Sequence, residues 1–313
     1  MSTFLYSGDA LARYGFPAGH PFGADRQAAF LNEARHQNLL QRALQQEPRS
    51  ASAAEIARFH TPPYVAFVQR MSERGSGSLD YGDTPAFPGV YEAAATVVGS
   101  ALAGLEAIMA GHAARTFQPI GGLHHARRER AAGFCVFNDI GVIVDTLRSH
   151  YGIQRIAYVD IDVHHGDGVF YPYEDDPELI FADIHQDGDT LYPGTGAAHE
   201  TGKGAAAGTK LNIPLPPGAG DEQFAAAWQR VLAHLDAFRP SFVILQCGAD
   251  SLAGDPLASL RYTPAVHARA ARDLCAVAQR HAAGRIMGLG GGGYDRNNLA
   301  LAWCGVLREF LDV

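Results

Sequence analysis

Short apolar runs alternate with longer stretches of helical periodicity over most of the chain. Runs rich in Val, Ile, Leu and Phe predict β-strands, because they are short and continuously apolar; they cover residues 155–162, 179–185, 241–247 and 285–289. Apolar residues at helical spacing predict helices over residues 26–46, 91–110, 221–238, 264–281 and 298–311. Continuous apolar strands that alternate with helices indicate an α/β protein whose parallel sheet is covered on both faces.

Length and charge narrow the class of protein. The 313 residues contain no fixed-period repeat and no low-complexity linker, so we expect one domain over residues 1–313. The net charge of −8 argues against nucleic-acid binding, which needs a basic surface. An apolar stretch at residues 93–111 contains Glu106 and is of marginal length for a bilayer. We interpret it as a buried helix and expect no membrane partner.

The cysteines and the N-terminus bear on the cellular compartment. The four cysteines are scattered and form no C-x-x-C pair, so the sequence signals neither a thiolate zinc site nor a redox motif. The first residues include no basic segment followed by an apolar core, so we expect no signal peptide. Both features favour a cytoplasmic protein.

Acidic and histidine side chains gather at the end of the first predicted strand. Asp160, Asp162 and His164 are spaced by two, and on an extended strand such residues point to the same side. Two carboxylates and one imidazole suit Zn²⁺, and three protein ligands would leave a position for water and substrate. Asp250, shortly after the strand at 241–247, is the candidate third ligand. An Asp at that place can also be a helix cap or turn former.

Two consecutive histidines, His124 and His125, follow a Gly-Gly turn. A neutral imidazole is the natural general base near neutral pH. Asp160 and Asp167 are the spare acids near the predicted metal site, and each could fix the tautomer of one histidine. A His-His pair alone often has no function.

Four glycines at residues 290–293 precede Tyr294. Such a run is costly in folding entropy and indicates that the backbone packs closely against another group. The phenol of Tyr294 could donate to a substrate carbonyl and, together with a metal, stabilise a tetrahedral oxyanion. A plain loop or a phosphate-binding turn is the alternative. The chain contains neither G-x-G-x-x-G nor G-x-x-x-x-G-K-[ST], which disfavours nucleotide binding.

Recognisable motifs occur in order along nearly the whole chain. They lie at residues 20–21, 59–62, 121–125, 133–135, 160–168, 192–196, 248–250 and 290–294. Together they resemble the histone deacetylase family, which also contains acetylpolyamine amidohydrolases and acetoin-utilisation proteins. The resemblance implies the arginase–deacetylase fold, a single-domain α/β fold whose parallel sheet of about eight strands has helices on both faces.

The resemblance also implies two metal sites. One Zn²⁺ per chain would be held by Asp162, His164 and Asp250, and a zinc-bound water would attack an amide carbonyl. A structural K⁺ would lie beneath it, at positions that correspond to Asp160, Asp162, His164, Asp183 and Ile184. Asp183 departs from the family's pattern, which usually has a small hydroxyl residue at this position.

The catalytic roles follow from the same resemblance. His125 corresponds to the general base and acid, oriented by Asp167. His124 corresponds to its partner, hydrogen-bonded to Asp160. Tyr294 corresponds to the donor that stabilises the oxyanion.

Substrate-binding residues are implied in the same way. Phe134 and Tyr192 correspond to the aromatic walls of a narrow tunnel, and Gly133 precedes that wall. Asp83 corresponds to a carboxylate at the tunnel rim. Leu257 stands where polyamine-selective relatives carry an acid, which favours an acyl-lysine side chain of a protein over a charged polyamine.

Other functions stay open at this point. The chain could act on acetylpolyamines or another small acylated amine, and it could form homo-oligomers. The same fold would permit a dimetal ureohydrolase of the arginase kind, although that needs more carboxylates around a second ion. A non-catalytic binding module fits less well, because all the expected catalytic residues are present.

Overall fold

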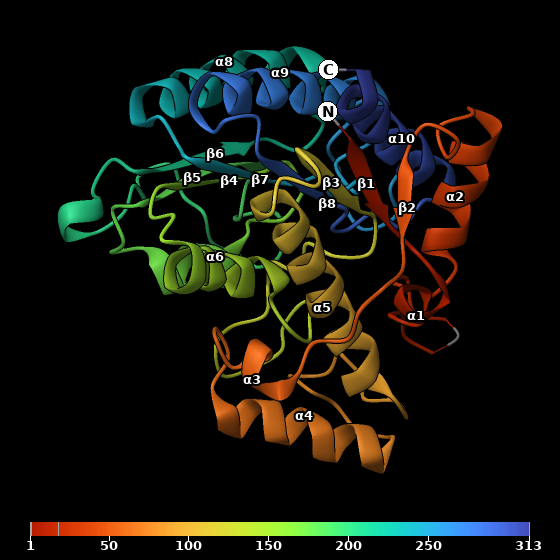
Figure 1. Ribbon diagram of the computed structural model, residues 1–313. Coiled ribbons are helices and arrows are strands. Elements are labelled where there is room, and N and C mark those ends of the chain that lie inside the picture. The colour runs from red at the N-terminus through yellow and green to blue at the C-terminus, as the bar shows by residue number, and fades with distance from the viewer. Residues whose placement is uncertain (1, 18, 313) are drawn as a thin grey trace.

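A computed structural model describes residues 2–17 and 19–312. Eight strands among them form one sheet, and all pair in parallel. The strand order is β2-β1-β3-β8-β7-β4-β5-β6 (Figure 1). The strands are β1 (Thr3–Tyr6), β2 (Leu44–Gln46), β3 (Arg115–Gln118), β4 (Ile156–Asp160), β5 (Leu179–Gln186), β6 (Lys210–Leu215), β7 (Phe242–Gln246) and β8 (Ile286–Leu289).

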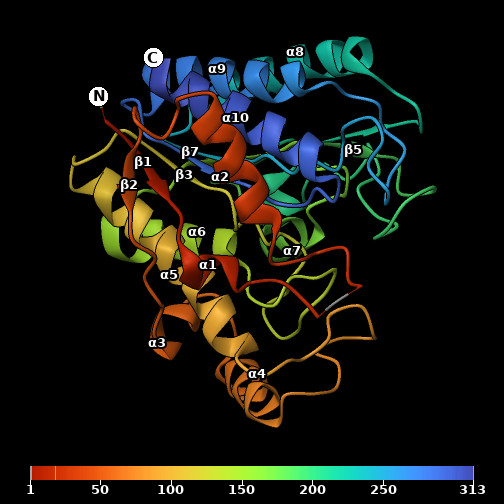
Figure 2. The same ribbon diagram turned by 90° about the vertical axis from the view of Figure 1, so that its right-hand side faces the viewer.

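Helices lie against both faces of this sheet (Figures 1 and 2). Helices α5 and α6 cover one face, whereas α2, α8, α9 and α10 cover the other. The helices are α1 (Asp9–Ala12), α2 (Arg26–His36), α3 (Ala53–Ile56), α4 (Pro62–Arg74), α5 (Val90–Met109), α6 (Asp139–Tyr151), α7 (Asp167–Phe170), α8 (Asp221–Phe238), α9 (Pro264–His281) and α10 (Arg296–Asp312). The predicted fold class is confirmed.

Successive strand residues pack into two separate apolar layers. In β4, Tyr158 joins the core beneath α5 and α6, while Val159 joins the core beneath α8, α9 and α10. In β5, Phe181 and Ala182 divide in the same way. Because both faces are buried, these strands contain continuous apolar runs rather than alternating ones.

The four central strands determine where the functional residues gather. Strands β3, β8, β7 and β4 are consecutive neighbours, and all run in the same direction. Their carboxyl ends therefore meet at one edge of the sheet, which is where ligands bind in open parallel sheets. The loops that leave these ends contain the predicted histidine pair, the glycine run and the three predicted metal ligands.

One predicted helix was too long. The helix expected over 26–46 ends at His36, and residues 44–46 form the edge strand β2. Asn38 has a φ of 58°, and the Leu39 amide donates to the Ala34 carbonyl, so the chain turns in a left-handed C-terminal cap. Strands β1, β2, β3 and β6 were not predicted, because they are short or contain polar residues.

The apolar stretch predicted as a buried helix forms α5. It is the one helix among residues 2–17 and 19–312 that is long and apolar enough to cross a membrane, and 78% of its most apolar 18-residue stretch is buried inside the protein.

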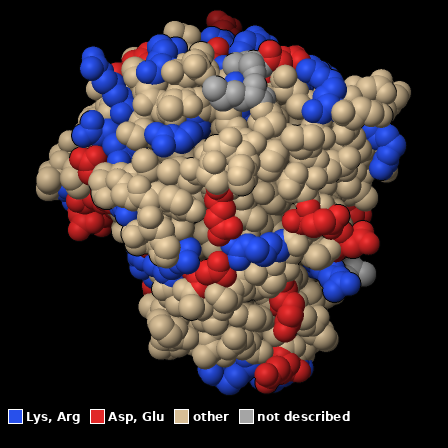
Figure 3. Space-filling model, in the orientation of Figure 1, with Lys and Arg blue, Asp and Glu red and all other residues tan. Residues whose placement is uncertain are grey.

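On the face drawn in Figure 3, acidic and basic side chains are interspersed.

Gly99 lets α5 approach a neighbouring segment closely. A Cβ at this position would lie 2.2 Å from the Arg49 carbonyl oxygen and 2.4 Å from the Ala51 amide. Gly99→Ala should therefore lower the free energy of unfolding by about 1–3 kcal/mol, as overpacked sites do. Denaturant titration measures it, with Gly220→Ala as control, where the nearest atom is 3.6 Å away. Equal stability of the two variants would contradict the proposed contact.

Candidate metal centre

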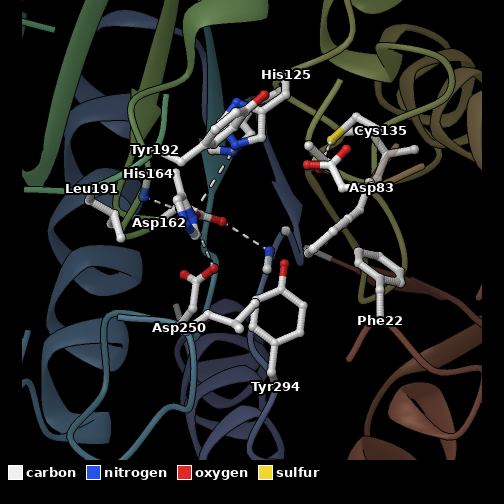
Figure 4. Close-up of a pocket in the computed structure, with 18 residues that line it drawn as sticks. Phe22, Asp83, His125, Cys135, Asp162, His164, Leu191, Tyr192, Asp250 and Tyr294 are labelled. Atoms are coloured by element: carbon white, nitrogen blue, oxygen red, sulfur yellow. Dashed lines mark hydrogen bonds and ion pairs between the residues drawn. The ribbon is translucent and has the colours of Figure 1, made fainter. Parts of the chain in front are cut away.

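Asp162, His164 and Asp250 come together as the two loops following β4 and β7 meet. Their ligand atoms all lie within 4.8 Å of one another. His164 Nδ1 is 3.1 Å from Asp162 Oδ1 and 3.4 Å from Asp250 Oδ2 (Figure 4). Both carboxylates are buried. The three predicted ligands thus converge on one point.

The backbone reaches this arrangement differently from the prediction. Strand β4 ends at Asp160, so Asp162 and His164 lie in the loop beyond it and not on an extended strand. Side chains hold the loop: Asp160 Oδ1 accepts from the Asp162 amide and Asp162 Oδ1 from the His164 amide, both at 3.0 Å. Asp250 Oδ1 accepts from the Val163 amide at 3.1 Å, which ties the two loops together.

The three residues fit a divalent cation. Asp250 Oδ2 is buried and has no hydrogen-bond partner among the described residues. Burial and the charge of Asp162 raise the pKa of Asp250 to about 7. Burial lowers the pKa of His164, but the two carboxylates outweigh it and raise the pKa to about 10. The site therefore attracts positive charge, and its two carboxylates and one imidazole are a donor set typical of zinc.

Each histidine of the pair is bonded to its own carboxylate. His124 Nδ1 is 2.8 Å from Asp160 Oδ2, and His125 Nδ1 is 2.7 Å from Asp167 Oδ1. The two Nε2 atoms face each other at 3.1 Å. Burial lowers the pKa of His124, but Asp160 and Asp162 outweigh it and raise the pKa to about 9. Burial and the charge of His124 lower the pKa of His125 to about 4, so His125 is the neutral member.

The glycine run passes directly against the ligands. A Cβ at Gly292 would lie 2.0 Å from Asp250 Oδ2, and the Gly292 amide donates to Asp162 Oδ2 at 2.9 Å. The prediction of a closely packed backbone is confirmed by this contact. Tyr294 follows with its ring at the cavity (Figure 4). Burial and the charge of Asp250 raise the pKa of Tyr294 well above its usual range, so its hydroxyl keeps its proton.

A cavity of about 240 Å³ leads to these residues from the surface. Phe134 and Tyr192 line it, and Tyr192 lies with its ring centroid 5.1 Å from that of His125. Gly133 and Phe134 both have positive φ, 52° and 67°, which is unusual for a bulky side chain and turns the Phe134 ring towards Tyr294. The exposed residues Asp83 and Leu257 also line the cavity.

The residues expected at a monovalent-cation site lie one layer deeper. Asp160 and Asp183 are directly paired on β4 and β5, and both are fully buried. Asp183 Oδ1 lies 2.8 Å from His185 Nδ1, and Oδ2 accepts from the Gly166 amide at 2.8 Å. Ile184 follows in β5. The unusual carboxylate therefore already has partners of its own.

Comparison with known proteins now decides the family. A profile described as the histone deacetylase domain matches residues 20–310. The chain belongs to the histone deacetylase domain family. It is accordingly a hydrolase of the deacetylase or amidohydrolase kind, and its Asp-His-Asp cluster is a plausible zinc site.

Members of the histone deacetylase family from distant organisms are similar over most of this chain. The acetoin utilization protein AcuC of Bacillus subtilis is 35% identical over 305 residues, which cover 94% of this chain and 78% of that protein. A histone deacetylase-like amidohydrolase of Pseudomonas aeruginosa is 35% identical over 271 residues, or 84% and 69% of the two chains. The crystal structure of the HDA15 HD domain aligns with a TM-score of 0.90 at 27% identity, covering 99% of this chain and 88% of that one.

No sequence pattern marks Arg26, which is completely buried behind the site. Its guanidinium donates to the Gly293 carbonyl from Nε at 2.9 Å and to the Gly291 carbonyl from Nη2 at 2.6 Å. It also lies 4.1 Å from the ring centroid of Phe22. Arg26 thus supports the glycine loop from behind. Its place in the first turn of α2, 265 residues from the glycine loop in sequence, hides that role.

Metal analysis of variants tests the candidate ligands. The purified chain should bind close to one zinc ion, and Asp250→Ala should weaken binding by more than the roughly 10–100-fold that follows loss of an outer-shell partner. Asp189→Ala, at an exposed acid, is the control. About two Mn²⁺ per chain would instead favour the dimetal ureohydrolase, and zinc retained by Asp250→Ala would exclude that residue as a ligand.

Proposed function

We propose that this protein is a zinc-dependent deacylase that hydrolyses the amide of an N-acetylated or short-acylated primary amine, with an acyl-lysine side chain as the favoured substrate. The observation that carries the proposal is the meeting of Asp162, His164 and Asp250 at a cavity that His125 and Tyr294 also line. The names of the related proteins, which include deacetylases and an amidohydrolase, support the same class of reaction.

Asp162, His164 and Asp250 would hold the zinc ion. When bound there, Zn²⁺ would supply a Lewis acid that polarises the amide carbonyl and activates a water molecule. The shell around the ligands favours a fixed geometry. Gln246 Nε2 and the Gly292 amide both donate to Asp162 Oδ2 at 2.9 Å, which orients that carboxylate.

His125 is placed to move the proton. With Nδ1 bonded to Asp167, its Nε2 is the ring atom left to accept a proton from water and later deliver it to the leaving amine. Water would take the place of the contact that this Nε2 makes with His124 Nε2 at 3.1 Å. The carboxylate of Asp167 stabilises the imidazolium formed in between. His124 already holds positive charge beside it. That charge lowers the pKa of His125 and keeps its imidazole neutral before the reaction.

Tyr294 supplies the hydrogen bond for the developing negative charge. Its phenol stays protonated because burial and Asp250 raise its pKa. A donor fixed before the reaction costs no reorganisation when the carbonyl oxygen becomes an oxyanion.

The cavity and its rim favour a slender, apolar substrate stem with a polar head outside. Phe134 and Tyr192 border the cavity, and Leu257 adds an apolar side chain at its exposed part. These side chains suit the methylene chain of an acylated lysine. Asp83 at the rim suits a backbone amide or an amine of the substrate, which leaves acetylpolyamines as the second candidate.

We also propose a K⁺ ion beneath the zinc site, at Asp160, Asp162, His164, Asp183 and Ile184. The support is the pairing of two buried carboxylates on neighbouring strands. The bonds of Asp183 to His185 and to the Gly166 amide balance part of its charge.

Tyr294→Phe tests the oxyanion role. Removing the phenolic donor should lower kcat by about 10²–10³, the usual effect of losing one such donor, while zinc content stays near normal. A fluorogenic acetyl-lysine assay with zinc analysis measures both quantities. The control is Tyr151→Phe at an exposed tyrosine of α6. Unchanged turnover in Tyr294→Phe would refute the role.

Leu257→Glu tests substrate choice. A carboxylate at this exposed position should lower KM for acetylated putrescine or spermidine about fivefold, since an exposed ion pair contributes up to about 1 kcal/mol. KM for an acetyl-lysine peptide should change little. Wild-type preference for the acetylpolyamines would reverse the proposed order of substrates, and zinc-loaded protein silent on both would overturn the proposed function.

A further inference from the structure

Both oxygens of Asp167, the carboxylate behind the proposed general base, have partners. Oδ1 accepts from His125 Nδ1 at 2.7 Å, and Oδ2 accepts from Arg127 Nη2 at 2.5 Å. The Asp167 side chain is only 5% exposed. A buried carboxylate held at each oxygen by a charged or polar donor cannot rotate without losing a strong hydrogen bond.

Arg127 is itself fixed in place. Its guanidinium carbon lies 4.9 Å from the ring centroid of Tyr171, and the Tyr171 hydroxyl donates to Glu200 Oε1 at 2.8 Å. Glu200 Oε2 in turn accepts from the amides of Gly196 and Ala197 at 2.8 and 2.7 Å. The chain of contacts therefore connects Asp167 to the loop that follows the tunnel residue Tyr192.

A second cavity of about 470 Å³ lies beside the tunnel and reaches this ion pair. It shares Asp83 and Tyr192 with the tunnel, and its other lining residues include Arg127, Arg130 and Asp167. The Arg127 side chain is 22% exposed. Its guanidinium thus lies at this cavity, directly beside the carboxylate that orients His125.

We infer that Arg127 is a positioning residue, which locks Asp167 so that His125 keeps its proton on Nδ1 and presents Nε2 to the reaction. The inference rests on the proposed function. Without the guanidinium, Asp167 Oδ2 would take water from the second cavity, and the carboxylate could turn away from the imidazole. Arg127 touches neither substrate nor metal in this role, so it acts on the chemical step and not on substrate binding.

Steady-state kinetics of the zinc-loaded full chain test this role. Arg127→Met should lower kcat about 10–100-fold with KM within about twofold, since a small misplacement of a catalytic group costs up to about 10²-fold. Arg127→Lys should recover part of the rate, because one ammonium can still donate to Asp167 Oδ2. Arg130→Met is the matched control, since Arg130 lines the same cavity without a bond to Asp167.

Chemical rescue separates positioning from a merely structural role. Guanidinium chloride at non-denaturing concentration should restore part of kcat in Arg127→Ala, because the second cavity is large enough to admit the ion. It should leave Arg130→Met and wild type unchanged. Wild-type kcat in Arg127→Met, or a loss in Arg127→Ala that guanidinium does not relieve at all, would overturn the inference.

A spectroscopic readout keeps this test apart from that of the proposed function. In zinc-loaded protein without substrate, the Nδ1 proton of His125 should give a low-field NMR signal because it is bonded to Asp167. Arg127→Met should shift or broaden that signal, and Arg130→Met should not. An unaltered signal in Arg127→Met refutes the positioning role even if the chain hydrolyses no acylated amine. A wild type inactive on all acylated amines refutes the proposed function alone.

Discussion

The site depends on how buried negative charge is balanced at one edge of the sheet. Five aspartates are nearly or fully buried there: Asp160, Asp162, Asp167, Asp183 and Asp250. Asp160, Asp167 and Asp183 each have a histidine of their own as partner, and Asp167 also has an arginine. The remaining two, Asp162 and Asp250, share His164. Both carboxylates also accept hydrogen bonds from neutral donors. Neutral donors do not cancel charge, and uncompensated buried charge costs several kcal/mol, so these two carboxylates are where a divalent cation fits best.

The buried carboxylates also explain why glycines stand in the backbone beside them. A carboxylate that orients a metal needs donors close by, and a side chain would keep them away. A Cβ at Gly248 would lie 2.0 Å from Asp162 Oδ2, and one at Gly292 equally close to Asp250 Oδ2. The glycine run therefore brings the Gly292 amide against Asp162, while the Gly290 and Gly291 amides donate to backbone carbonyls and Arg26 supports the run from behind. Its entropic cost in folding is met by the hydrogen bonds that it gives to the site.

The site residues that could be predicted from the sequence are those that lie in short motifs near the ends of strands. The residues of the metal cluster, the histidine pair and the glycine run each lie within a few positions of a central strand, so their meeting followed from parallel strand order. The four strands that were not predicted depend on tertiary pairing, and the end of α2 depends on one left-handed residue, Asn38. Arg26 and Arg127 could not be recognised, because their roles come from contacts across 265 and 40 residues and no local pattern marks them.

The proposed reaction centre and the residues proposed to select the substrate differ in burial. The proposed metal ligands and histidines are buried or nearly so, and each is held by several bonds, so a change at one disturbs the others. Asp83, Tyr192 and Leu257 are exposed at the mouth of the tunnel, at 45% for Tyr192 and 37% for Leu257. Such positions can change with little cost in stability. Under the proposed function, the side chains at the rim would therefore decide between acyl-lysine and acetylpolyamine substrates without any change at the buried centre.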